Sequence, residues 1–367
     1  MNYKHLNILG SMSGTSLDGI DLCLVRSNGV NLKRLNKNFY KEFNQKTKNI
    51  LTDFIDNFSI KKPDFKYFKK VNTLVTKEYI TAISEFNIIE DCDLISFHGQ
   101  TIFHNPKKES IQIGDGKFIS KYFKKPVVYN FRENDIKNGG EGAPISPIYH
   151  KFLIENYKLE LPSCILNIGG ISNLTYWDGK LLIAFDTGPG NLLINKFMNE
   201  KFKKKYDKNG ILASRGTTYS PFCKNFLRNE FFLKNFPKSL DSKYFQNDYQ
   251  EVFNSNLSDI DKISTLLDFT IYSIQQGINL LPQKIKSLIV VGGGSHNLEL
   301  IKRLGNVLQI EITKNKWEKE INNFLEAEMI AYLGARKIHD LPSTFLQTTG
   351  TKIPTVLGSI YPIIKNL

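Results

Sequence analysis

The residues between Gly10 and Asp21 have the types and spacing of an anion-binding turn. The segment reads Gly-Ser-Met-Ser-Gly-Thr-Ser-Leu-Asp-Gly-Ile-Asp and lies between two apolar runs, which predicts a β-hairpin with a turn of small residues. Three glycines let backbone N–H groups approach an anion closely, and the hydroxyl side chains add donors. Asp18 and Asp21 add carboxylates that could hold a hydrated magnesium ion. The alternative is a tight turn whose hydroxyls bond only to nearby backbone.

Asp186 has the position of a general base. It follows the apolar run from Leu181 to Phe185 and opens the turn Asp-Thr-Gly-Pro-Gly-Asn, after which helical spacing predicts a helix from about Asn191. A carboxylate at the carboxyl end of a strand, before a helix, faces the usual ligand crevice of α/β folds. There it could remove a proton from a reacting group. The alternative is a carboxylate that only caps a turn or helix.

Glycines and histidines follow two other predicted strands. Gly292, Gly293 and Gly294 precede a helix, so a flat ring such as adenine could lie against their backbone, although a structural loop has the same pattern. His98 and His104 lie six residues apart. A metal site needs more ligands, so polar contacts in a cleft or structural hydrogen bonds are the favoured interpretation.

Arg132 and Glu326 are candidate contacts for a charged or hydroxylated ligand. Arg132 precedes a glycine-rich loop at 139–144, which suits recognition of a carboxylate, and the alternative is a surface salt bridge. Glu326 lies near the start of a helix predicted at 324–339. It could accept sugar hydroxyls, or it is an ordinary acid in a first helical turn.

Length and composition favour a two-domain cytoplasmic protein. The chain has 367 residues, 41% of them hydrophobic, which suffices for sizeable cores. No apolar run approaches the ~20 residues of a membrane-spanning helix, and the first residues lack an apolar signal region. The four cysteines form no CxxC pair, which argues against a zinc site or disulfide framework. The net charge of +13 comes from dispersed lysines, so neither nucleic acid nor a membrane is a favoured partner, although an anionic substrate could be attracted.

The elements that must position these residues repeat once along the chain. A strand, a turn of glycine and serine and a second strand occur at 6–25 and again at 164–176. This repeat predicts two related halves of a layered α/β fold. Helices are predicted at 46–58, at 67–85, from 258 to about 281 and at 324–339. We place an N-terminal domain at 1–131, with the tail 340–367 packing back on it, and a C-terminal domain at 132–339.

Together these motifs resemble those of the anhydro-N-acetylmuramic acid kinase family. The matching segments, in the family's order, are Gly10–Asp21, Phe97–Thr101, Asn130–Arg132 with Asp135, Gly139–Pro144, Leu166–Asn173, Phe185–Asn191, Gly292–Gly294 with Asn297, and Glu326–Ala327. The resemblance runs from residue 10 to about residue 330. The combination is highly specific even where single pieces are not.

The resemblance implies a two-domain α/β fold of the sugar kinase, Hsp70 and actin superfamily, which is ribonuclease H-like, with an ATP cleft between duplicated halves. It implies conversion of 1,6-anhydro-N-acetylmuramic acid, ATP and water to N-acetylmuramic acid 6-phosphate and ADP, in peptidoglycan recycling. The partners implied are the anhydro sugar, ATP and Mg²⁺, with no nucleic acid and no membrane. Members of the family are typically dimers, so we expect a homodimer.

The resemblance also assigns roles to residues. Asp186 matches a catalytic aspartate that takes a proton from water, which attacks the anomeric carbon, and the released 6-oxygen attacks the γ-phosphate of ATP. Glu326 matches an active-site glutamate, and Arg132 matches an arginine near the lactyl carboxylate. The other expected sugar contacts are His98, Gln100, Asp135 and Asn173. The expected ATP-binding residues are Gly14, Thr15, Ser16, Leu17, Asp18, Gly19, Ile20, Asp21, Gly169, Gly170, Gly188, Gly190, Asn191, Gly292, Gly293, Gly294 and Asn297. Asp18 and Asp21 are expected to hold Mg²⁺ indirectly.

The chain departs from the family's pattern in two places. Glu141 replaces a glutamine, and a carboxylate beside an anionic sugar is unfavourable unless it is turned away or paired. The motif Pro-Lys-Ser-Thr-Gly-Arg reads Pro-Lys-Ser-Leu-Asp-Ser from Pro237 to Ser242, without the arginine. Both departures support a rival hypothesis, a kinase of the same superfamily that acts on another sugar. A second rival is a non-catalytic nucleotide-binding sensor, against which the retained Asp186 argues.

Overall fold

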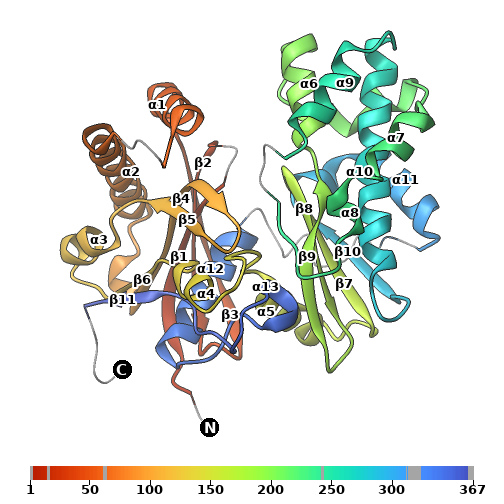
Figure 1. Cartoon of the computed structure of the whole chain (residues 1–367). Coiled ribbons are helices and arrows are strands. Elements are labelled where there is room, and N and C mark those ends of the chain that lie inside the picture. The colour runs from red at the N-terminus through yellow and green to blue at the C-terminus, as the bar shows by residue number, and fades with distance from the viewer. Residues whose placement is uncertain are drawn as a thin grey trace. The chain divides into compact units, whose positions relative to one another are not determined.

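The computed structural model describes residues 3–14, 17–60, 64–240, 244–310, 312 and 324–362. The chain divides into two compact units (Figure 1). Unit 1 comprises Met1–Phe152, Trp317–Leu346 and Gly350–Leu367, and unit 2 comprises Leu153–Lys316 and Gln347–Thr349. The chain therefore returns to its first unit after completing the second.

Unit 1 is built on a sheet that has seven strands among the described residues, in the order β11-β6-β4-β1-β2-β3, with β5 paired to β4. The strands are β1 (Leu6–Ser13), β2 (Gly19–Ser27), β3 (Leu32–Glu42), β4 (Leu94–Asn105), β5 (Glu109–Ile113), β6 (Val127–Tyr129) and β11 (Ser359–Tyr361). The first three form an antiparallel meander, and β4 runs parallel to β1 on its other side. Both β1 and β2 are mainly buried, because both faces of the sheet are covered.

The helices of unit 1 cover the two faces of this sheet. They are α1 (Gln45–Asn57), α2 (Phe65–Phe86), α3 (Gly116–Phe123), α4 (Glu133–Lys137) and α12 (Leu325–Ile338). Leu9 belongs to a hydrophobic core cluster with Val71 and Val75 of α2, whereas a side chain at Gly10 would point at α12. Successive residues of a strand point to opposite faces, so α2 and α12 cover opposite faces. The polar caps Asn44 and Asp64 accept N–H bonds at the starts of α1 and α2.

Unit 2 has a four-stranded sheet in the order β10-β7-β8-β9 within its described residues. The strands are β7 (Ser163–Ile168), β8 (Ile171–Trp177), β9 (Leu182–Pro189) and β10 (Ser287–Val291). The helices are α6 (Leu192–Phe202), α7 (Ser220–Phe226), α8 (Glu230–Leu233), α9 (Gln246–Asn254), α10 (Asp259–Asn279) and α11 (Leu298–Leu308). Ser258 caps the start of α10, where Asp261 N–H donates to Ser258 Oγ at 3.1 Å.

Four strands of the unit 1 sheet, in the order β4-β1-β2-β3, match the order β10-β7-β8-β9 of unit 2, which confirms the predicted duplication and the α/β fold class. In unit 1, β1, β2 and β3 form an antiparallel meander, and β4 adds beside β1 in parallel. In unit 2, β7, β8 and β9 form the meander, and β10 adds beside β7 in parallel. A meander of three strands followed by a parallel neighbour of the first strand is the ribonuclease H-like arrangement that the motifs imply.

The compact units and the predicted domains have different boundaries along the sequence. The first passage of the chain between units occurs within α5 (Pro147–Asn156), at Phe152, rather than at residue 131. Helix α12 belongs to unit 1, whereas the prediction placed 324–339 in the C-terminal domain. The reason is that α12 packs on β1 and β2, a contact that sequence distance conceals.

Gly10 is the point at which α12 meets the first strand. An added Cβ at Gly10 would overlap the carbonyl oxygen of Ala327 and approach Cβ of Ala331 at 2.9 Å. Gly19 is equally confined, because its Cβ would overlap the carbonyl of Lys41. Packing by itself therefore accounts for glycine at two of the three positions that the sequence pattern assigned to anion binding, Gly10 and Gly19.

A buried ion pair ties α12 to the sheet on the same side. Arg34 Nε of β3 donates to both carboxylate oxygens of Glu328 at 2.9 Å. The hydroxyl of Tyr149 in α5 donates to Glu328 Oε2 at 2.8 Å. The Glu328 side chain is only 3% exposed, so these donors compensate a charge removed from water. Burial raises the pKa of the Tyr149 hydroxyl well above its usual value, which keeps it a donor.

Replacement of Gly10 by alanine is expected to destabilise the protein, because the new methyl group must displace the backbone of α12. The expected loss is about 2 kcal/mol or more in chemical denaturation. Gly305→Ala is the matched control: Gly305 lies within α11, its nearest neighbour would be 3.5 Å from the new Cβ, and a gain of roughly 0.5–1 kcal/mol is expected there. Equal effects of the two changes would contradict the packing argument.

Candidate active site

The predicted phosphate-binding hairpin connects β1 and β2 of unit 1. Thr15 and Ser16 lie outside the described residues. The hydroxyls of two other predicted donors are used within the protein. Ser11 Oγ donates to the Ser96 carbonyl at 3.2 Å, and Ser13 Oγ shares a hydrogen bond of 2.7 Å with the Tyr79 hydroxyl. These two serines therefore fix strand β1.

Gln100 supports this hairpin from the neighbouring strand β4. Its Nε2 donates to the Gly14 carbonyl at 3.3 Å and to the Thr101 carbonyl at 3.1 Å. The side chain is fully buried, and among the described residues its Oε1 has no hydrogen-bond partner. A buried amide oxygen without a partner is costly, so a donor from a ligand would satisfy it.

Two carboxylates approach each other where β2 and α12 begin. Desolvation, and secondly the negative charge of Glu326, raise the pKa of Asp21 to about 7. Glu326 keeps contact with solvent, yet desolvation by the surrounding protein raises its pKa, and Arg132 opposes this rise. Asp18 forms an ion pair with Lys48, whose Nζ lies 3.4 Å from Asp18 Oδ1. A cation beside Asp21 would relieve the repulsion that raises its pKa.

The candidate site of unit 1 contains the cation Arg132 and two neutral histidines, His98 and His104, near it. Burial, and then the charge of Arg132, lower the pKa of His98 and of His104 to about 3. Both imidazoles are therefore neutral at physiological pH. His98 Nδ1–H donates to the Gly99 carbonyl at 3.0 Å. Among the described residues, His98 Nε2 and both ring nitrogens of His104 are buried without hydrogen-bond partners. These nitrogens are available to a ligand.

The glycine-rich loop after α4 is ordered by Asp135 and Arg132. Asp135 is fully buried, and its Oδ2 accepts the Gly142 N–H at 2.8 Å. Arg132 Nη1 donates to the Gly142 carbonyl at 3.0 Å. The buried Glu141 faces Lys107, with 3.3 Å between Nζ and Oε1. Lys107 is thus the cation that pairs with Glu141. Sequence reasoning did not identify Lys107, because it lies in the β4–β5 turn and belongs to no motif.

Asp186 of unit 2 lies within β9, which continues to Pro189 instead of ending at Phe185 as predicted, and it pairs with Asn173 of β8 in the strand register. Its side chain is 8% exposed. Residues 236–240, here called the strap, lie beside β9 at Asp186. Asp186 N–H donates to the Lys238 carbonyl at 2.9 Å, and Leu240 N–H donates to Asp186 Oδ2 at 2.8 Å. Asn173 Oδ1 is buried and, among the described residues, has no hydrogen-bond partner.

The glycines of unit 2 separate into two kinds. At Gly188, Gly190, Gly292 and Gly294 a Cβ would overlap or crowd protein atoms, so the fold itself requires glycine. At Gly170 and Gly293 a Cβ would meet no described atom within 4 Å. Internal packing does not account for glycine at these two positions.

Two asparagines predicted to bind ATP have structural partners in unit 2. Asn191 Nδ2 donates to the Ile168 and Gly169 carbonyls at 3.2 Å, and this holds the turn between β7 and β8. Asn297 caps α11, because its Oδ1 accepts the Leu300 N–H at 3.0 Å. Asn191 thus shapes the turn, and Asn297 fixes the start of the helix.

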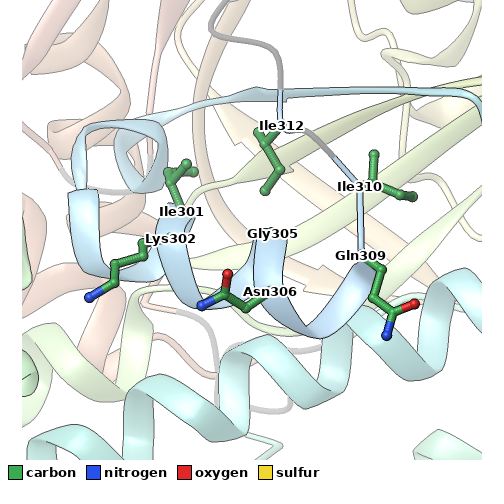
Figure 2. A pocket seen from close by; sticks show the side chains of 7 residues that line it. All are labelled: Ile301, Lys302, Gly305, Asn306, Gln309, Ile310 and Ile312. Atoms are coloured by element: carbon green, nitrogen blue, oxygen red, sulfur yellow. The ribbon is translucent and has the colours of Figure 1, made fainter.

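A hollow of about 560 Å³ lies beside α11, away from these residues. Figure 2 shows the side chains that line it: Ile301, Lys302, Gly305, Asn306, Gln309, Ile310 and Ile312. None of them is a predicted site residue, and the lining offers no carboxylate, imidazole or hydroxyl group. Among the described residues, no group of three or more His, Cys, Asp or Glu side chains could hold a metal ion. No described helix has the length and apolar character needed to cross a membrane.

Comparisons with known proteins identify the family. A family model described as anhydro-N-acetylmuramic acid kinase matches residues 6–363. The protein of that name from Pelagibacter ubique is 38% identical over 387 residues, 99% of each chain. The one from Bradyrhizobium diazoefficiens is 34% identical over 369 residues, 97% of this chain and 99% of the relative. Among solved structures, component A of (R)-2-hydroxyglutaryl-CoA dehydratase from Acidaminococcus fermentans is 13% identical with a TM-score of 0.46, over 90% of this chain and 99% of that one. The family model and the two relatives, each matched over nearly its whole length, show that this chain belongs to the anhydro-N-acetylmuramic acid kinase family.

Proposed function

We propose that this protein uses ATP to convert 1,6-anhydro-N-acetylmuramic acid and water to N-acetylmuramic acid 6-phosphate and ADP. The observation that carries the proposal is Asp186, a nearly buried carboxylate in the second half of β9, held by backbone groups of the strap and facing Asn173. A base needs a fixed direction and a neighbour that orients the reacting group, and this arrangement supplies both.

In the proposed reaction Asp186 accepts a proton from water while the water oxygen bonds to the anomeric carbon. The bond from that carbon to the bridging 6-oxygen breaks, and its electron pair passes to the oxygen. This oxygen then bonds to the γ-phosphorus of ATP, and the bond between the γ-phosphorus and the oxygen bridging to the β-phosphate breaks, releasing ADP. The hydrogen bond from Leu240 N–H to Oδ2 limits the rotation of the carboxylate and so directs it at the water.

Residues of unit 1 are proposed to recognise the sugar. Arg132 pairs with the lactyl carboxylate, and the neutral imidazole of His98 bonds to hydroxyl or amide groups through its unpartnered Nε2. Asp135 acts indirectly, because it is fully buried and orders the loop. The ion pair of Glu141 with Lys107 removes the main electrostatic objection to an anionic sugar. The other departure, at Ser242, lies outside the described residues.

The nucleotide is proposed to bind through the β1–β2 turn and through Gly170 and Gly293. The open space at these two glycines suits a ligand that lies against the backbone. Mg²⁺ fits beside Asp21 through a water molecule, since a positive charge there offsets the desolvation and repulsion that raise the pKa of Asp21. When bound, the ion neutralises phosphate charge. We place the reaction in the cytoplasm, where ATP is available, in the recycling of peptidoglycan fragments, and we propose that the enzyme is a homodimer.

Asp186→Asn is expected to lower turnover by roughly 1,000-fold, because the amide keeps the shape but cannot accept the proton. ADP release should be measured with MgATP in the presence and absence of 1,6-anhydro-N-acetylmuramic acid, with the phosphorylated product identified by mass spectrometry. ATP affinity should remain within about twofold of the wild type. Asp259→Asn, an exposed change in the first turn of α10, is the control. If the Asp186 variant keeps full turnover, the assignment of the base is wrong.

Gly293→Val is expected to weaken ATP binding by about tenfold without loss of stability, because the new side chain enters space that the protein does not fill. Gly294→Ala provides the contrast: its Cβ would overlap Ile168, so stability should fall. Isothermal titration with a non-hydrolysable ATP analogue and thermal unfolding separate the two effects. Unchanged ATP affinity of the Gly293 variant would exclude this turn from the nucleotide site.

Arg132→Lys is expected to raise the KM for the anhydro sugar by about 10- to 100-fold, because an ammonium cannot make the bidentate contact of a guanidinium. The KM for ATP should not change. The matched test uses 1,6-anhydro-N-acetylglucosamine, which lacks the lactyl group. Its kcat/KM should differ little between wild type and variant, and an equal loss with both sugars would refute the pairing with the lactyl carboxylate.

A further inference from the structure

Lys238 is a buried lysine whose side chain the proposed reaction does not use. It is 7% exposed and lies in the strap of unit 2. Its Nζ donates to the Lys234 carbonyl at 2.8 Å and to the Phe231 carbonyl at 3.1 Å. The ammonium also lies 4.6 Å from the ring centroid of Phe231 and 5.8 Å from that of Phe185. A lysine is rarely retained at such depth unless its charge has partners.

The strap that carries Lys238 contacts β9 at three successive points. The ring of Phe236 stacks on Phe185, the residue before Asp186, at 5.5 Å between centroids. The carbonyl of Lys238 accepts the Asp186 N–H at 2.9 Å, and Leu240 N–H donates to Asp186 Oδ2 at 2.8 Å. The position of the strap therefore sets the direction of the Asp186 carboxylate.

We propose that Lys238 is a positioning residue for Asp186: its ammonium anchors the strap to the carbonyls of Phe231 in α8 and of Lys234 just after it, and its charge favours the ionised carboxylate. The proposal rests on the proposed function, in which Asp186 is the base. The side chain of Lys238 itself touches neither water nor sugar in this scheme. It acts through the strap and through the electric field at β9.

The charge balance around Lys238 agrees with this role. Burial lowers the pKa of Lys238 to about 8. The negative charge of Asp186 on β9 raises this pKa, and the positive charge of Lys234 lowers it further. The ammonium form therefore prevails at neutral pH and depends on Asp186 as a partner. By reciprocity, an interaction that favours the charged lysine also favours the charged aspartate. A neutral side chain could fill the same space but would remove this interaction.

Lys238→Met tests the proposal, because methionine fills much of the volume and can neither donate nor carry charge. We expect kcat to fall by about 10- to 100-fold, with the KM values for ATP and sugar changed less than threefold. The acid limb of the kcat–pH profile should move up by roughly half a unit to one unit, since Asp186 protonates more readily without the neighbouring charge. Lys238→Gln keeps two N–H donors, so it should lose less kcat and show the same pH shift.

Lys234→Met is the matched control, because its side chain is 55% exposed and its carbonyl, which anchors Lys238, is retained. Its activity should match the wild type, and the acid limb should not move up, because loss of the Lys234 charge favours the ammonium form of Lys238. A second readout does not need turnover: the ¹³C-carboxyl signal of Asp186, assigned by its loss in Asp186→Asn, should titrate at higher pH in both Lys238 variants. If the wild type shows no sugar-dependent ADP release, the proposed function fails, and this titration still decides the role of Lys238.

Three results would overturn the proposal. One is an Asp186 titration that is the same in the wild type and in both Lys238 variants. Another is a loss of thermal stability in Lys238→Met with kcat and acid limb unchanged. The last is failure of both Lys238 variants to fold, which would make the lysine a structural anchor of unit 2.

Discussion

The close contact of α12 with β1 at Gly10 is the constraint on which unit 1 depends. A helix can approach a sheet this closely only where the strand has no side chain, and a Cβ at Gly10 would overlap the Ala327 carbonyl. The contact joins residues more than 300 positions apart and completes unit 1 with the last part of the chain. It also sets where Glu326 and Glu328 lie. One of these carboxylates is buried and paired with Arg34, and the other faces Asp21.

Unit 2 solves a comparable problem with hydrogen bonds instead of a missing side chain. Asp186 lies in the second half of the buried strand β9, where an unsupported carboxylate would be costly. The strap supplies an acceptor for its N–H group and a donor for its carboxylate. The strap is in turn fixed by a buried ammonium that bonds to two carbonyls. The Asp186 carboxylate is thus held by a backbone group of a segment about fifty residues later in the sequence.

Burial and charge pairing determine which side chains of the candidate site in unit 1 are neutral and which are charged. Burial and the charge of Arg132 keep His98 and His104 neutral. Both imidazoles therefore act as hydrogen-bonding groups, and Arg132 is the cation beside them. Glu141 is balanced by Lys107, which comes from a turn without any motif. The predicted site glycines of unit 2 also differ from one another. Most of them lie against protein atoms. Among those described, only Gly170 and Gly293 would have no described atom within 4 Å of an added Cβ.

The amino-acid sequence by itself determined the strands and helices, the duplication, the family and the residues expected to do chemistry, because these depend on short-range periodicity and on local motifs. The helix after Ser258 is an example, since its cap and apolar spacing are all local. Only the tertiary structure decided which glycines serve packing, that Ser11 and Ser13 are already bonded and that α12 belongs to unit 1. It also decided that Lys107 pairs with Glu141 and that the buried Lys238 bonds to backbone carbonyls. These properties arise from contacts between segments distant in sequence, and burial, clash and charge pairing exist only once those segments meet.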